Sequence, residues 1–149
     1  MNLKKVEKNL TDLLNKKMGL DFKYKTEDGL LVASCDLKVY DRERPATCTL
    51  WVFEAGTAIF SFLFDKIPYT ALTLDTAAKF NSEVTFLKAT VTSGMLNILH
   101  EAYIVEEKSL PDYVKGILGV LVSQDVKNYL EGLLLLCDSN KENNPEVAS

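Results

Sequence analysis

Apolar residues recur at helical spacing near the start of the chain and at alternating positions after it. Residues 3–17 are predicted to form an amphipathic helix, because apolar residues return every three or four positions and charged residues fill the other side. The apolar set is Leu3, Val6, Leu10, Leu13 and Leu14. From residue 20 the period changes to two, which is typical of a strand with one wet face. A hairpin turn at Asp28-Gly29 joins this strand to a second strand over residues 30–39.

Residues 47–64 contain two β-rich runs around a turn at Ala55-Gly56, which predicts a central hairpin. A loop of two or four residues would place Trp51 opposite Phe60. Because side chains alternate along a strand, that register predicts one face shared by Trp51, Phe53, Phe60, Phe62 and Phe64. The other face is also largely apolar, with Cys48, Leu50, Val52, Ile59 and Leu63. We therefore expect a cover on each face, only one of which need be the chain's own helices.

The second half of the chain continues the alternation of helices and strands. A helix is predicted over residues 71–83 with Thr70 as its N-cap, followed by strands over residues 84–92 and 95–106. Ser109-Leu110-Pro111 opens a last helix of about 25 residues with a possible kink near Ser123. The order α-β-β-β-β-α-β-β-α predicts an α+β fold, with a mostly antiparallel sheet of about six strands and three helices. We expect one domain over residues 1–137 and a disordered polar tail over residues 138–149.

The last helix has a wider apolar surface than one sheet face covers. Its prominent members are Leu118, Leu121, Val122 and Tyr129. Gly116, Gly119 and Gly132 would each weaken an exposed helix by about 1 kcal/mol relative to alanine. Their presence favours positions where another backbone comes close.

The net charge and the hydropathy of the chain argue against two classes of protein, nucleic-acid binders and membrane-spanning proteins. The formal net charge of −4 argues against a nucleic-acid binder, which needs a basic patch to neutralise phosphates. The longest apolar run, over residues 133–137, is too short to span a bilayer, so no membrane partner is expected. Met1-Asn-Leu-Lys-Lys5 leads into amphipathic sequence, not into an apolar leader, so we expect a cytoplasmic protein with reduced thiols.

Candidate catalytic chemistry is weak. The single histidine, His100, has Leu99 and Glu101 as neighbours, which point away from it across the pleat, and a structural role is favoured. Cys35 and Cys48 are expected about opposite each other on neighbouring strands. A cross-strand disulfide or half of a thiolate metal site is possible in that position, but buried free thiols are favoured. With no phosphate loop, nucleophile elbow or zinc motif in the sequence, we expect no enzymatic activity, no cofactor and no metal.

Residues 77–97 read as a helix ending in asparagine, a strand, a turn and a strand. In this stretch and in its order of elements the chain resembles the bacterial YbjN family of candidate sensory-transduction regulators, which has a type III secretion chaperone-like fold. Four strands precede the second helix here, where secretion chaperones usually have three. The resemblance implies an acidic cytoplasmic homodimer that holds a partially unfolded protein segment on apolar surface. It implies no catalytic residue.

Two main hypotheses follow for the function. The first is a non-enzymatic, homodimeric protein-binding module that uses apolar surface of the sheet or the last helix, with the candidate partner-binding residues Trp51, Phe53, Phe60, Phe62, Phe64, Leu118, Leu121, Val122 and Tyr129. The second is a small-ligand sensor with a pocket between sheet and helices, lined by Trp51, Phe62, Tyr103 and Tyr129. A thiol-dependent enzyme using Cys35, Cys48 or Cys137 is a third and weaker hypothesis.

Overall fold

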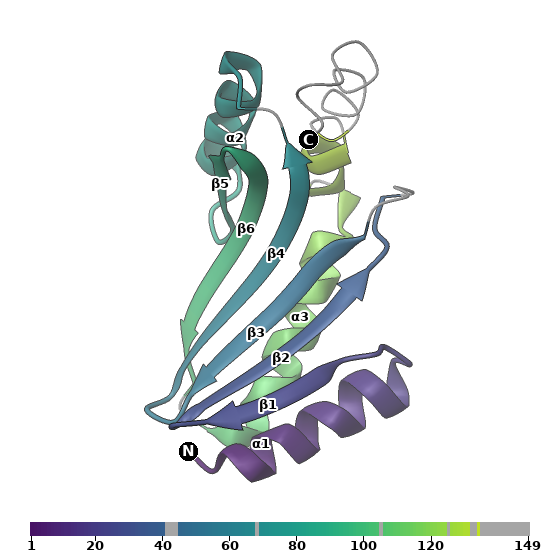
Figure 1. The fold of residues 1–149 in the computed structure, drawn as a ribbon, viewed down its shortest axis with the longest axis vertical. Helices are drawn as coiled ribbons and strands as arrows, with labels where there is room; N and C mark the ends of the chain where they lie inside the picture. The colour runs from purple at the N-terminus through teal and green to yellow at the C-terminus, as the bar shows by residue number, and fades with distance from the viewer. Residues whose placement is uncertain (41–44, 68, 105, 125, 132–133, 135–149) are drawn as a thin grey trace.

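A six-stranded antiparallel sheet forms the centre of the computed structural model, which describes residues 1–40, 45–67, 69–104, 106–124, 126–131 and 134. Within these residues the strands are β1 (Lys23–Glu27), β2 (Leu30–Leu37), β3 (Ala46–Phe53), β4 (Thr57–Ile67), β5 (Lys88–Thr92) and β6 (Gly94–Tyr103). Their order across the sheet is β1-β2-β3-β4-β6-β5 (Figure 1). Each neighbouring pair is antiparallel, which confirms the predicted α+β fold class and strand number.

The helices occupy the positions that the hydrophobic periodicity predicts. They are α1 (Leu3–Leu10), which continues as a π-helical segment (Thr11–Lys17), then α2 (Ala71–Glu83) and α3 (Leu110–Leu121), which follows a short 3-10 turn (Glu107–Ser109). After α3 the chain turns at residues 122–123, and residues 126–131 are helical again. The predicted kink near Ser123 is therefore a break between two helical segments. The predicted tail over residues 138–149 lies outside the described residues.

Local hydrogen bonds fix the helix starts. The side chain of Asn2 accepts from the backbone N–H of Lys5 at 3.2 Å and caps α1. Thr70 and Thr73 form a reciprocal capping box at the start of α2, as the predicted N-cap requires. Pro111 lies in the first turn of α3, where its missing N–H costs no hydrogen bond.

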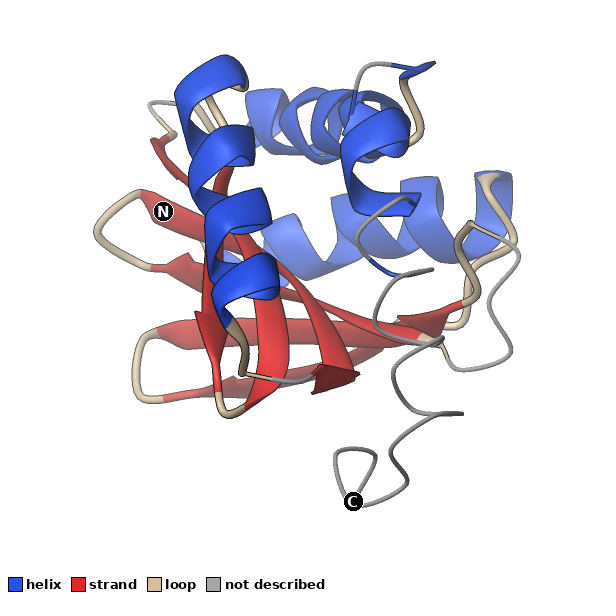
Figure 2. Cartoon of the chain, turned by 90° about the horizontal axis from the view of Figure 1, so that it is seen from above, coloured by secondary structure: helices blue, strands red, loops and turns tan. Residues whose placement is uncertain are grey.

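The hydrophobic core lies between one face of the sheet and the helices, which gather on one side of it (Figure 2). The sheet contributes buried side chains that alternate along the strands, among them Leu31, Leu50, Phe60, Phe62, Phe64, Leu96 and Ile98. The helices contribute apolar residues at helical spacing, among them Val6, Leu10, Leu14, Ala77, Phe80, Val114, Ile117 and Leu121. The first helix therefore buries the stripe that its sequence predicts.

The register of the central hairpin differs from the prediction. Trp51 pairs with Ile59, whereas Phe60 pairs with Leu50. The reason is a three-residue loop over residues 54–56, in which the N–H of Gly56 donates to the carbonyl oxygen of Phe53 at 2.8 Å. Gly56 has φ +107°, a conformation that glycine accepts readily. Because an odd loop shifts the pairing by one residue, every side chain of one strand changes face relative to the prediction.

The expected aromatic face is therefore divided between the two sides of the sheet. Phe60, Phe62 and Phe64 are buried under the helices, while Trp51 and Phe53 point to the other side. That other side is not covered by any helix of the described chain (Figure 2). We call it the helix-free face, and its apolar members, all half-buried or exposed, are Leu30, Val32, Trp51, Phe53, Ile59, Leu63, Met95, Leu99 and Tyr103.

Candidate functional site

An apolar groove of about 440 Å³ lies beside α3, at the end of β2 and near the segment that follows the first helix. We call it the α3 groove. Its lining is Met18, Leu20, Leu37, Lys38, Val39, Phe62, Lys115, Leu118, Gly119, Leu121 and Val122. Among these residues only the two lysines carry charge, so the groove combines an apolar wall with two cationic groups.

One face of α3 forms a wall of this groove. Lys115, Leu118, Gly119 and Val122 are spaced i, i+3, i+4 and i+7, which places them on one side of a helix. The buried residues of α3 lie on a different side and hold the helix against the sheet, namely Leu110, Val114, Ile117 and Leu121. The core thus fixes the orientation in which α3 presents its second, unburied apolar face.

A hydrogen bond holds the end of α3 near the chain that follows β2. The hydroxyl of Tyr40 donates to the carbonyl oxygen of Leu121, and its ring stacks on Phe64 with centroids 6.4 Å apart. Burial raises the pKa of Tyr40 well above its usual range, so the hydroxyl keeps its proton, and stays a donor, in alkaline as well as neutral solution. This contact keeps α3 and the end of β2 at a fixed separation, with the groove between them.

The groove exposes large apolar side chains to solvent. Val122 is 64% exposed and Met18 is 40% exposed, and Leu118 is half-buried. At Gly119 a Cβ would have no described heavy atom within 4 Å apart from its local backbone, so the wall is open there. Gly116 on the flank of the same helix has equally open space but does not line the groove. No close backbone from the described chain therefore accounts for either glycine, and Gly132 lies outside the described residues.

The structure brings part of the predicted partner-binding set together and separates the rest. Phe62, Leu118, Leu121 and Val122 line the α3 groove. Phe60 and Phe64 are buried in the core, and Trp51 and Phe53 lie on the helix-free face. Tyr129 packs edge-to-face against Phe80 of α2, with ring centroids 6.0 Å apart.

Sequence reasoning missed the other lining residues. Met18 and Leu20 flank Gly19 after the first helix, and Leu37, Lys38 and Val39 lie at the end of β2. These segments are far from α3 in sequence, and only the assembled sheet places them beside it. The spacing of Lys115, Leu118, Gly119 and Val122 was the one local signal that could have identified the α3 wall.

The predicted ligand pocket does not form from its four predicted residues. Phe62 faces the helices, whereas Trp51 and Tyr103 lie on the helix-free face, where Tyr103 is 72% exposed. The hypothesis placed these aromatic side chains around one cavity. That arrangement is wrong because the one-residue shift of the central hairpin places Trp51 on the face opposite Phe62, and Tyr103 of β6 pairs with Thr57 on that same opposite face.

His100 lies at the edge of the core and contacts α3. Its Nδ1 is 2.7 Å from the hydroxyl oxygen of Tyr113, and the two ring centroids are 5.4 Å apart. Loss of solvent contact lowers the pKa of His100, and burial raises the pKa of Tyr113 to about 12. A hydrogen bond between two partly buried rings is the arrangement expected of a structural histidine.

Cys35 and Cys48 lie directly opposite each other on β2 and β3, as predicted. Both are buried, and neither forms a disulfide with another described residue. Burial raises the pKa of both thiols, which disfavours the reactive thiolate. The described residues contain no group of three or more His, Cys, Asp or Glu side chains placed to hold a metal ion.

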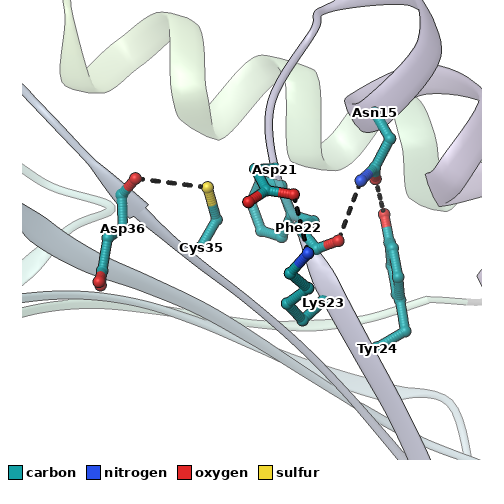
Figure 3. A network of polar contacts seen from close by, with 7 residues as sticks. All are labelled: Asn15, Asp21, Phe22, Lys23, Tyr24, Cys35 and Asp36. Carbon is teal, nitrogen blue, oxygen red and sulfur yellow. Dashed lines mark hydrogen bonds and ion pairs between the residues drawn. The ribbon is translucent and has the colours of Figure 1, made fainter.

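Polar contacts near Cys35 join the first helical segment to β1 (Figure 3). The Nδ2 of Asn15 donates to the carbonyl oxygen of Phe22 at 2.9 Å, and its Oδ1 accepts from the hydroxyl of Tyr24 at 2.7 Å. The thiol of Cys35 lies 3.5 Å from the carbonyl oxygen of Asp36, at the other side of the view. Asn15 thus anchors the chain just before Met18 and Leu20 enter the groove lining.

Comparisons with protein-family models, with curated proteins and with solved structures found no match to this chain. In the described part of the chain, no helix has the length and apolar character needed to cross a bilayer.

Proposed function

We propose that this protein is a non-enzymatic, chaperone- or adaptor-like module that binds a segment of a partner protein in the α3 groove. The observation that supports this proposal is the exposure of Met18 and Val122 beside an apolar groove of about 440 Å³. Contiguous apolar surface of this kind is typical of protein-binding sites. The YbjN-like order of elements adds the expectation of a chaperone-like binding role.

The size of the groove suits a short peptide segment. Burying three apolar side chains would contribute on the order of 5–9 kcal/mol. Part of that free energy offsets the loss of translational and side-chain freedom on association. The net free energy of binding is therefore smaller than this gross value, and we expect weak, reversible binding, which suits a module that takes up and releases its partner.

Substitutions at the two glycines of α3 test the groove. In Gly119→Met a flexible side chain would enter the groove, whereas in Gly116→Met the same side chain would lie outside it. Both changes remove a helix-weakening glycine from α3, so both variants should fold at least as well as the wild-type protein. Gly116→Met is therefore a matched control.

The experiment is a pull-down from a bacterial lysate with quantitative mass spectrometry, using the wild-type protein and both variants. We expect a set of partners that Gly116→Met retains and Gly119→Met loses. If all three proteins capture the same partners in the same amounts, the α3 groove is not the binding site.

We also propose that a second copy of this chain packs on the helix-free face. Trp51 lies at its centre, opposite Val32 on β2 and Ile59 on β4. Two such faces related by a twofold axis would stack as the sheets of a sandwich do and remove this apolar surface from water. The expected dimer matches the homodimer that the family resemblance implies.

Light scattering at micromolar concentration tests the dimer. We expect Trp51→Lys to be monomeric and the wild-type protein to be dimeric. Leu72→Lys is the control, because Leu72 is an exposed apolar residue of α2, 48% exposed, outside the helix-free face. A monomeric wild-type protein would contradict the proposed dimer and leave the groove hypothesis unaffected.

A small apolar ligand in the α3 groove is the alternative function. The volume of about 440 Å³ falls within the range of ligand pockets, about 300–1,000 Å³. Native mass spectrometry of the purified protein distinguishes protein binding from small-ligand binding. A co-purified small molecule that is present with Gly116→Met and absent with Gly119→Met would favour the ligand-binding alternative.

A further inference from the structure

We infer that the partner segment bound in the α3 groove is acidic as well as apolar. This inference rests on the proposed function and adds the chemistry of the partner. Its basis is the pair of exposed lysines that line the groove, Lys38 just after β2 and Lys115 on α3. Among the described residues that line the groove none is acidic, although the whole chain has a net charge of −4.

The two lysines differ from the five lysines that form ion pairs within the described residues. Neither forms an ion pair with any residue that the structure describes, whereas five other lysines have a carboxylate oxygen within 4.0 Å, namely Lys5, Lys16, Lys23, Lys25 and Lys108. The aliphatic stem of a lysine can pack on apolar surface while its ammonium reaches solvent. Lys38 and Lys115 can therefore extend the apolar lining and still offer two positive charges to a partner.

Charge complementarity then selects the partner. A segment that places apolar side chains against Leu118 and Val122 brings its flanking residues near Lys38 and Lys115. Aspartate or glutamate at those flanking positions would form ion pairs with the two ammonium groups, whereas lysine or arginine would be repelled. The open wall at Gly119 lets the backbone of such a segment approach α3 closely.

Selection from a displayed library of short random peptides tests this inference. The baits are the wild-type protein, Gly119→Met, and the double variant Lys38→Glu with Lys115→Glu. A second double variant, Lys4→Glu with Lys79→Glu, changes the net charge equally at exposed lysines that do not line the groove. It is the control for a non-specific effect of charge.

We expect the wild-type protein and the Lys4/Lys79 control to enrich peptides that combine apolar residues with Asp and Glu. The Lys38/Lys115 variant should instead enrich peptides with Lys and Arg, and Gly119→Met should enrich neither class. For one enriched peptide, Lys38→Gln or Lys115→Gln should weaken binding about 1.5- to 5-fold, as expected for exposed ion pairs. Higher salt should weaken wild-type binding in the same direction.

The outcomes separate this inference from the function on which it rests. Peptides that depend on Gly119 but show no excess of acidic residues would overturn the inference and leave protein binding in the groove intact. Peptides that bind Gly119→Met as well as the wild-type protein would contradict the groove itself. If laurate shifts the NMR signals of Gly119 and Val122 and no enriched peptide does, the occupant is a small anionic amphiphile and the inference is wrong.

Discussion

The side-chain amide of Asn81 forms two hydrogen bonds with the backbone of Ala89. Its Nδ2 donates to the carbonyl oxygen of Ala89 at 2.8 Å, and its Oδ1 accepts from the N–H of Ala89 at 2.6 Å. Ala89 lies in β5, which is an edge strand of the sheet. Asn81 thus occupies the place that another strand would take at this residue and joins α2 to the sheet edge.

Asn81→Ala should loosen this edge. We expect the free energy of unfolding to fall by about 1–2 kcal/mol, because two backbone groups of Ala89 lose their partner. The amide of Ala89 should exchange with solvent faster in hydrogen-exchange NMR. Ser82→Ala is the control, because among the described residues the hydroxyl of Ser82 bonds within α2, to the carbonyl oxygen of Lys79. Unchanged exchange at Ala89 in Asn81→Ala would contradict the assigned role.

Gly56→Ala should destabilise the protein more than Gly94→Ala. Both glycines have positive φ, +107° and +84°, so alanine is strained at both positions. At Gly56 a Cβ would also lie 3.2 Å from the carbonyl oxygen of Ile104, whereas at Gly94 no described heavy atom lies within 4 Å. We expect losses of about 1–2 kcal/mol at Gly94 and about 2–4 kcal/mol at Gly56, measured by urea unfolding. Equal losses would show that the close approach to Ile104 has no energetic effect.

The same loop shows where sequence reasoning succeeds and where it fails. Capping residues and hydrophobic spacing are local signals, so the helix after Thr70 was predicted correctly. The pairing of Cys35 with Cys48 was also predicted correctly, because the two strands follow each other in sequence. The register of the central hairpin depends on the number of loop residues. Because both faces of the hairpin are largely apolar, the hydrophobic pattern fits an even and an odd loop equally well and could not determine that number. The observed loop has three residues in place of the predicted two or four, and this moved Trp51 away from Phe62 and onto the helix-free face.

The α3 groove was beyond prediction for a different reason. Its walls come from the end of the first helical segment, the end of β2 and α3, and no local pattern links Met18, Leu37 and Val122. The surplus of apolar residues on the last helix was visible in the sequence. Which of them face the groove depends on the orientation of α3 about its own axis. That orientation is set by packing of the buried side chains in the whole fold.

The thiols of Cys35 and Cys48 should be inert in the folded protein. Cys48 is fully buried and Cys35 is 7% exposed, and burial raises the pKa of both. In a Cys137→Ser variant, which leaves these two thiols alone, we expect slow reaction with a disulfide reagent in buffer and fast reaction of both in urea. Fast labelling of either thiol in the native state would revive the hypothesis of a thiol-dependent enzyme.

His100 should make the protein less stable as the pH falls. Loss of solvent contact lowers the pKa of His100 in the folded state below its ordinary value of 6.5, so the unfolded chain binds the proton more readily. The stability from this group is fully present above about pH 6.5 and is lost as the pH falls through the folded pKa. Because His100 is the single histidine, its ring proton gives one NMR titration curve, whose midpoint we expect below 6.5. Urea unfolding between about pH 7.5 and 5.5 should show a steeper loss for the wild-type protein than for His100→Gln. A midpoint at or above 6.5, or equal slopes in the two proteins, would contradict the desolvated position of this ring beside Tyr113.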